Sequence, residues 1–326
     1  MKAIKYLLIS IITLTSLTFV SCGKSNIDST GCYTDIEAAE KAALKKNQDI
    51  LAIVTMNGDD AYSVQFTDEI IRNPKFKEEV TSKFAVVRMD FSQSAYEATV
   101  AAEDANDSAK KNAEKRAVAM QKNTKFANLL NVTVTPTVYI LSKEKYIITG
   151  INYDALNKNY EVFKQALDDS AETIELMHKM IAQTKTGTAE EKINAIDELY
   201  EATMPEARLL LADLLSSTKK IDASNKSGLL GKLLFAAADA KAAVAMNSGN
   251  PRDAVNAYLA LENEDSLSPA EHQQAIYTAA YLCSMTEIED LSVVIGYLNK
   301  AIAIDPDGEE VPAIKRVIEA LSANGQ

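Results

Sequence analysis

The sequence of 326 residues contains no tryptophan, two histidines and three cysteines. The cysteines are Cys22, Cys32 and Cys283, so the chain has no Cys-x-x-Cys pair. Neither these cysteines nor His178 and His272 have metal-ligand spacing, and neither histidine accompanies a nucleophile. A P-loop, a dinucleotide-binding fingerprint and a Ser/His/Asp pattern are also missing. We therefore expect no metal, no cofactor and no catalytic residue of these classes.

Long apolar runs are almost as rare, and the single one lies at the N-terminus. Lys2 and Lys5 precede the uncharged apolar residues 6–20, a stretch too short to span a bilayer comfortably. Such a segment is typical of a signal peptide. It ends at Val20-Ser21-Cys22, which resembles a bacterial lipobox.

The lipobox resemblance implies that residues 1–21 are a signal peptide and that Cys22 becomes a lipidated first residue. The protein would then lie in the bacterial cell envelope, on a periplasmic or extracellular face, and contact the membrane only through its lipid. The alternative is an ordinary secretory signal followed by a chance cysteine. Residues 22–33 are small and polar, and this composition predicts a flexible tether.

Basic charge is scarce in the second half of the chain. Residues 22–152 carry 17 Lys and Arg against 18 Asp and Glu, whereas residues 153–326 carry 15 against 28. Nucleic-acid binding needs a basic footprint, so we expect no nucleic acid as a partner. The length and the charge difference together predict two domains, residues 34–155 and 156–326.

Helix and strand patterns alternate in the first of these domains. Asp35 precedes an alanine-rich helical stretch. The apolar runs at 49–56 and 84–91 have the composition of strands covered on both faces. Helical stretches around Pro74 separate these runs, and a further helix is expected at 122–132. Residues 137–141 and 146–151 predict an antiparallel hairpin. The pattern indicates an α/β fold with a central mixed sheet.

Several residues in this succession resemble the exported bacterial branch of the thioredoxin superfamily. They are Asp90-Phe91 after the second strand, Asn123 ahead of the third helix, and the segment Val134-Thr135-Pro136-Thr137. The resemblance implies a thioredoxin-like fold with Pro136 in the cis form. The alternative is a trans proline that begins a strand. In thioredoxins this proline faces a Cys-x-x-Cys pair at the end of the first strand.

The loop expected at that place contains no thiol. It consists of Asn57, Gly58, Asp59, Asp60 and Ala61, followed by Tyr62 and Ser63. Thiol–disulfide exchange requires a thiolate, so we expect none here. Asp59 and Asp60 could be cation ligands or helix caps, and capping is favoured because adjacent carboxylates point apart. Thr135, Pro136 and Tyr62 would form a lip that receives an extended peptide.

The remaining segments read as helical. Residues 92–122 predict an exposed helical insertion of unknown role. Residues 157–184 predict one long amphipathic helix, and helical patterns follow at 189–202, 205–218, 226–247, 251–262, 269–285, 289–304 and 309–322. Two segments resemble tetratricopeptide repeat helices, the first through Gly249, Ala254, Tyr258 and Leu261, the second through Val294, Leu298, Ala301 and Pro306. An irregular helical bundle is the alternative.

These patterns predict a redox-inactive, membrane-tethered binding or scaffolding module rather than an enzyme. The alternative is a thiol–disulfide oxidoreductase or redox accessory that uses Cys32 or Cys283. The partner would be a protein or peptide. A concave face in the acidic helical half would prefer basic segments, and the lip at Tyr62 and Pro136 is the competing site. The oligomeric state stays open.

Overall fold

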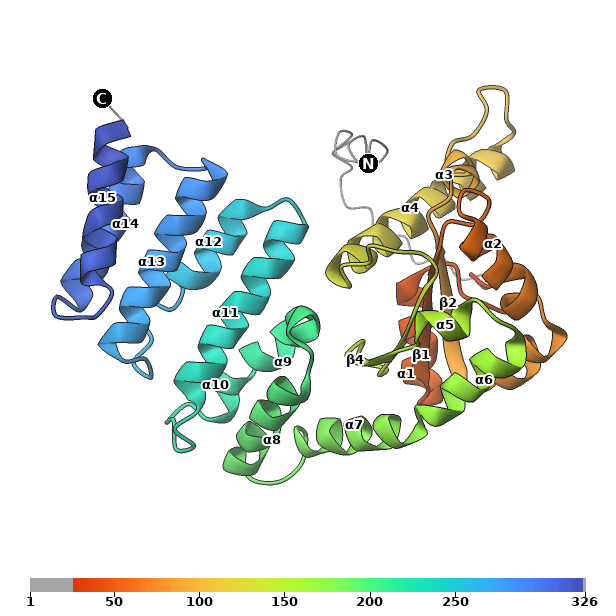
Figure 1. The fold of residues 1–326 in the computed structure, drawn as a ribbon, viewed down its shortest axis with the longest axis horizontal. Helices are drawn as coiled ribbons and strands as arrows, with labels where there is room; N and C mark the ends of the chain where they lie inside the picture. The colour runs from red at the N-terminus through yellow and green to blue at the C-terminus, as the bar shows by residue number, and fades with distance from the viewer. Residues whose placement is uncertain (1–25, 325–326) are drawn as a thin grey trace.

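The computed structural model describes residues 26–324. Figure 1 shows an α/β unit from which a succession of helices leads away to the C-terminus. Cys22 and the predicted signal peptide lie outside the described residues. Among the residues described, no helix has both the length and the apolar character needed to cross a bilayer.

Four strands form one mixed sheet in the order β2-β1-β3-β4. Strand β1 runs parallel to β2, while β3 is antiparallel to both β1 and β4. All residues of β1 are buried, because its alternate side chains enter two different cores on the two faces of the sheet. The predicted strands, hairpin and α/β class are confirmed, with bounds at β1 (Asp49–Thr55), β2 (Phe84–Asp90), β3 (Thr137–Leu141) and β4 (Ile147–Gly150).

Helical segments cover the sheet and begin at polar capping residues. Asp35 accepts a hydrogen bond from the main-chain nitrogen of Ala38 at 2.8 Å and so caps the first helix. Asn123 joins the fourth helix to the start of the first, since its amide contacts Ile36 N and Thr34 O. The segments are α1 (Ile36–Lys46), α2 (Ala61–Phe66), the π-helical turns η2 (Thr67–Ile71) and η3 (Phe76–Val80), α3 (Gln93–Glu97) and α4 (Asp107–Leu129).

The insertion at 92–122 is less separate than the sequence suggests. The first part of the insertion forms α3. The second part, from residue 107, continues without a break into the predicted third helix, and together these two segments form α4. The N-terminal half of α4 is exposed apart from Ala113, in agreement with its low apolar content. The helix continues because residues 107–129 contain neither glycine nor proline.

The flexible tether predicted for residues 22–33 is wrong for the part that the structure describes. Ile27 bridges to Tyr33, and Tyr33 bridges to Val87 in β2. The side chain of Asp28 accepts hydrogen bonds from Thr30 and from Cys32 N. Cys32 is fully buried in a core that includes Leu51. The main chain at this edge gains sheet-like hydrogen bonds, which composition alone does not reveal.

After the sheet the chain is helical throughout the described residues. The elements are α5 (Tyr153–Leu156), α6 (Tyr160–Asp169), α7 (Ala171–Gln183), α8 (Ala189–Ala202), η4 (Pro205–Leu211), α9 (Ala212–Ser216), α10 (Thr218–Ile221), α11 (Leu230–Asn247), α12 (Pro251–Leu259), α13 (Pro269–Thr286), α14 (Leu291–Ile304) and α15 (Val311–Asn324). These elements confirm a helical C-terminal region.

The single long helix predicted over 157–184 is instead two helices, α6 and α7, that meet at Ser170. The nitrogen of Ser170 bonds to the carbonyl of Leu167 at 3.3 Å, three residues back. Its hydroxyl donates to the carbonyl of Ala166 at 2.9 Å and replaces the missing helical bond. Serine hydroxyls that bond to the preceding turn often bend helices, and the helix is interrupted at this residue.

Helix α11 connects two hydrophobic cores. Leu233 and Ala237 on one side pack in the core that also contains Phe163 and β1 residues. Leu234 and Ala238 face the second core, which α12 to α15 complete. The positions that resemble tetratricopeptide repeats supply much of this second core, since Ala254, Tyr258, Leu261, Val294, Leu298 and Ala301 are all buried.

Helix α7 lies where the α/β unit meets the helical region. His178 Nε2 is 2.7 Å from Asp49 Oδ1 at the start of β1. Lys185 pairs with Glu144 in the hairpin turn. The contact with Asp49 gives His178 a structural role between α7 and β1. His272 also has a structural contact, since its Nε2 lies 2.9 Å from the carbonyl oxygen of Glu264.

Candidate functional site

The loop after β1 makes a tight turn that ends in a helix. The main-chain nitrogens of Asp59 and Asp60 both donate to the carbonyl of Met56, at 3.1 and 3.0 Å. Gly58 has a φ of 99°, a value that residues with a Cβ rarely adopt. The nitrogen of Asn57 donates to Asp90 Oδ1 at 3.0 Å, which ties the loop to the end of β2. The turn therefore places Asp60 at the N-cap position of α2, which begins at Ala61.

Asp60 caps α2 and also contacts the chain beside Pro136. Its carboxylate accepts bonds from Tyr62 N at 3.2 Å and from Ser63 N at 3.0 Å. The hydroxyls of Ser63 and Thr135 donate to Oδ2 at 2.7 and 3.0 Å. The Thr135–Pro136 peptide bond is cis. Asp60 and Ser63, three residues apart, lie at the start of the helix after the first strand, the region in which the resemblance implied a cysteine pair.

The electrostatics of this arrangement favour an ionised carboxylate. Burial by itself would raise the pKa of Asp60, but the hydrogen bonds from Ser63, Thr135 and Tyr62 N together hold it below its ordinary value. Ser63 is fully buried, and its Oγ also accepts a bond from Met56 N at 3.0 Å. Asp60 and Ser63 are therefore joined by hydrogen bonds, and together they carry one negative charge.

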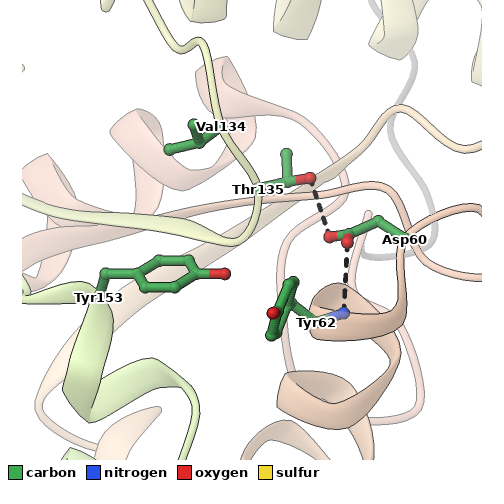
Figure 2. Close-up of a pocket in the computed structure, with 5 residues that line it drawn as sticks. All are labelled: Asp60, Tyr62, Val134, Thr135 and Tyr153. Atoms are coloured by element: carbon green, nitrogen blue, oxygen red, sulfur yellow. Dashed lines mark hydrogen bonds between the residues drawn. The ribbon is translucent and has the colours of Figure 1, made fainter.

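An open pocket of about 530 Å³ lies beside Asp60. Figure 2 shows its five lining residues, Asp60, Tyr62, Val134, Thr135 and Tyr153, which come from three separate segments. The two tyrosine rings meet edge to face, with centroids 5.8 Å apart and an interplanar angle of 68°. Val134 is 62% exposed, Tyr62 52% and Tyr153 39%. The pocket thus offers apolar surface to a ligand.

The main chain at the rim of the pocket retains hydrogen-bonding capacity. Within residues 26–324, neither the N–H nor the C=O of Thr135 takes part in a hydrogen bond. Pro136 is buried, whereas Thr135 is half-buried. Unpaired main-chain groups next to a strand can bind an extended segment through β-type hydrogen bonds.

Of the residues that the resemblance implied for a lip, Tyr62 and Thr135 line the pocket, whereas Pro136 is buried beside Thr135 and does not line it. Asp59 points elsewhere and accepts a bond from Gln93 N at 2.5 Å. Among the described residues, no group of three or more His, Cys, Asp and Glu side chains is placed to hold a metal. Asp60 acts as the helix cap, which was the favoured interpretation.

Sequence reasoning missed Tyr153 and Val134 as parts of this pocket. A topological signal was available for Tyr153. In the hairpin, Gly150 at the end of β4 pairs with Tyr139 near the start of β3, so β4 returns the chain toward Thr135. Asn152 then caps α5 through Asp154 N at 2.9 Å, and buried Leu156 anchors the short helix. Tyr153 is held over the pocket as a result.

The two remaining cysteines lie away from this pocket. Cys32 and Cys283 are free and fully buried, in different cores. Burial raises the pKa of Cys32 to about 12, and it also raises the pKa of Cys283. Cys32 is thus a core residue rather than part of a flexible tether, and Cys283 is a core residue on α13. Neither site has the exposure or low pKa that reactive thiols require.

Comparison with known families agrees with the observed topology. Residues 36–152 match the family model of the thioredoxin-like domain. Together with the mixed four-stranded sheet flanked by helices, this match shows that the first part of the chain is a thioredoxin-like domain. Residues 229–326, which begin next to α11, match a family model described as an uncharacterised protein C-terminal domain.

Two individual proteins are similar to parts of the chain. An uncharacterized protein of Treponema pallidum (strain Nichols) is 30% identical over 157 residues, which is 48% of this chain. The match spans about half, 51%, of that relative's length. A solved structure, a DsbH oxidoreductase, has 12% identity and a TM-score of 0.32, and the match covers 50% of this chain and 95% of the other.

Proposed function

We propose that this protein is a binding module that holds an extended polypeptide segment beside Thr135 and Pro136 without thiol chemistry. The observation that carries the proposal is the unpaired N–H and C=O of Thr135 at the rim of a pocket walled by Tyr62 and Tyr153. Main-chain pairing would supply affinity, and the exposed rings would supply contact area. The helical region would act as a scaffold beside this site.

The chemistry of the loop supports binding over disulfide exchange. Asp60 and Ser63 stand where exchange would need thiols, and a carboxylate and a hydroxyl cannot form a mixed disulfide. The alternative use of Cys32 or Cys283 would require each core to open, because both side chains are fully buried. What favours the pocket over a concave helical face is its combination of a cavity with unpaired main-chain groups.

The proposal is tested with the purified full chain and fluorescent capped heptapeptides of alternating serine and valine with one variable central residue. Tyr62→Ala and Tyr153→Ala should each weaken binding about 5-fold or more, since buried aromatic contacts dominate many interfaces. Tyr281→Ala is the matched control, because Tyr281 is 57% exposed but lies on α13. Binding that ignores Tyr62 and Tyr153 but weakens steeply with salt would move the site to the acidic helical half.

We further propose that the protein is tethered to the bacterial cell envelope by lipid on Cys22. The support is the apolar segment 6–20 that ends at Val20-Ser21-Cys22. Cys22→Ala should then remove fatty-acid labelling and release the chain from membranes. Equal membrane retention of the variant and the wild type, without labelling of either, would contradict a lipid anchor.

A further inference from the structure

The pocket beside Thr135 carries one formal charge. Among its five lining residues, Asp60 is the single ionisable group that is charged at neutral pH. The other walls are the rings of Tyr62 and Tyr153, the side chain of Val134 and Thr135. A carboxylate beside two partly exposed aromatic rings is a surrounding that suits a cation, because both the charge and the ring faces attract it.

We infer that the bound segment places a lysine or arginine side chain in this pocket, between Asp60 and the rings of Tyr62 and Tyr153. This inference rests on the proposed peptide binding and names the side chain that the site would select. A basic side chain has the required shape, since its apolar stem can lie along the tyrosine rings while its charged end reaches the carboxylate.

The hydrogen bonds of Asp60 leave room for this cation. Oδ2 already accepts the hydroxyls of Ser63 and Thr135 and the nitrogen of Ser63. Oδ1 accepts a single bond, from Tyr62 N at 3.2 Å. Because each carboxylate oxygen has about two acceptor positions, Oδ1 can accept another donor. Figure 2 shows the carboxylate at the edge of the pocket beside Tyr62.

The same bonds hold the carboxylate in place before any ligand arrives. Asp60 is fixed from α2 on one side and from Thr135 on the other, so a ligand does not have to order it. Thr135 is also the residue whose main-chain N–H and C=O are unpaired. A segment paired with Thr135 would therefore have its nearest inward-pointing side chain beside Asp60. Main-chain pairing at Thr135 and charge recognition at Asp60 would therefore be adjacent, because the Thr135 hydroxyl donates to the Asp60 carboxylate.

The test compares two heptapeptides that differ only at the central residue, lysine in one and norleucine in the other. Norleucine retains the apolar stem and lacks the charge. With the wild-type full chain, the lysine peptide should bind about 10-fold more tightly, the size expected for a partly screened ion pair with a cation–π contact. A central arginine should behave like lysine, and a central glutamate should bind less tightly than norleucine.

Asp60→Asn is the decisive variant because asparagine also caps helices well. The ratio of lysine-peptide to norleucine-peptide affinity should fall to about 2-fold or less, chiefly because the lysine peptide loses affinity. Asp59→Asn is the matched control, since it removes the same charge from the adjacent residue, whose carboxylate contacts Gln93 outside the pocket. The lysine preference should survive in that control.

Each result decides between the inference and the proposed function. Peptides that bind through Tyr62 and Tyr153 with equal affinity for lysine and norleucine would overturn the basic anchor and leave peptide binding intact. An equal loss of preference in Asp59→Asn and Asp60→Asn would overturn it as well, because the effect would then come from net charge. Failure of every peptide to bind would overturn both. Cooperative urea unfolding of Asp60→Asn excludes misfolding as the cause of a lost preference.

Discussion

The thioredoxin-like domain and the helical region each hold an aspartate in a tight polar loop ahead of a helix. Asp60 accepts main-chain bonds from Tyr62 and Ser63 and a bond from the Ser63 hydroxyl. Asp222 accepts bonds from Lys226 N at 2.9 Å, from Ser227 N at 3.0 Å and from Ser227 Oγ at 2.7 Å. The local chemistry of the two loops is nearly the same.

Their surroundings differ. Asp222 is 3% exposed, and its loop leads into α11, the helix that both cores share. Asp60 is half-buried and adjoins the pocket with Tyr62 and Tyr153. A capped aspartate is therefore a structural device in itself. It becomes a candidate binding group only where a cavity and unpaired main-chain groups adjoin it.

The largest difference should appear in stability. Asp222→Ala leaves buried N–H and O–H donors without an acceptor and should lower the free energy of unfolding by about 2–3 kcal/mol. Asp60→Ala removes a half-exposed helix cap and should cost about 1 kcal/mol. Urea unfolding of both variants measures the two values. The comparison would break if Asp60→Ala were the more destabilising change, because Asp60 would then be chiefly structural.

A smaller difference should appear in the dependence of stability on pH. Hydrogen bonds from the Ser227 hydroxyl and main chain lower the pKa of Asp222, and the bonds already described lower that of Asp60 against the effect of burial. An aspartate with a lowered folded-state pKa stabilises the fold above the unfolded value of about 3.9, and this contribution is lost as pH falls through the folded pKa.

Unfolding free energies at pH 6 and at pH 3 should therefore differ more in the wild type than in Asp222→Asn or Asp60→Asn. Each asparagine variant keeps an acceptor but cannot titrate, so it removes one part of the acid sensitivity. A wild-type difference that both variants leave unchanged would show that other carboxylates set the acid limit. The Asp222 variant should flatten the pH profile more, because hydrogen bonds dominate the lowered pKa of Asp222, whereas burial opposes the lowering most strongly at Asp60.

The strands and most helix starts were predictable from sequence because local signals agreed with the fold. The apolar run of β1 fits a strand buried on both faces, and Asp35 caps α1 as its position suggests. The edge at Ile27 to Tyr33 was not predictable, because its order comes from main-chain bonds to a distant strand. The break at Ser170 depends on one hydroxyl that serine often directs to water instead.

The candidate site was predictable in part for the same reason. Thr135, Pro136 and the loop at Asp60 could be paired through the resemblance, because the order of the strands brings them to one end of the sheet. Tyr153 follows from hairpin geometry, but only once the hairpin register is known. The sequence favoured capping for Asp59 and Asp60, but which of the two caps α2 required coordinates. Asp60 accepts bonds at the start of α2, whereas Asp59 accepts one from Gln93 N.

The smallest expected effect concerns Cys32 and Cys283, which lie in two different cores. In the folded full chain carrying Cys22→Ala, a thiol reagent at pH 8 should modify neither Cys32 nor Cys283 at an appreciable rate, because both are buried and burial raises both pKa values. In urea both should react at once. Cys32→Ser and Cys283→Ser assign any slow phase to one core. A fast reaction of either thiol in the folded protein would instead support a redox role for that residue. If replacing that cysteine with serine also abolished peptide binding, the function would be assigned to the cysteine and not to the Asp60 pocket.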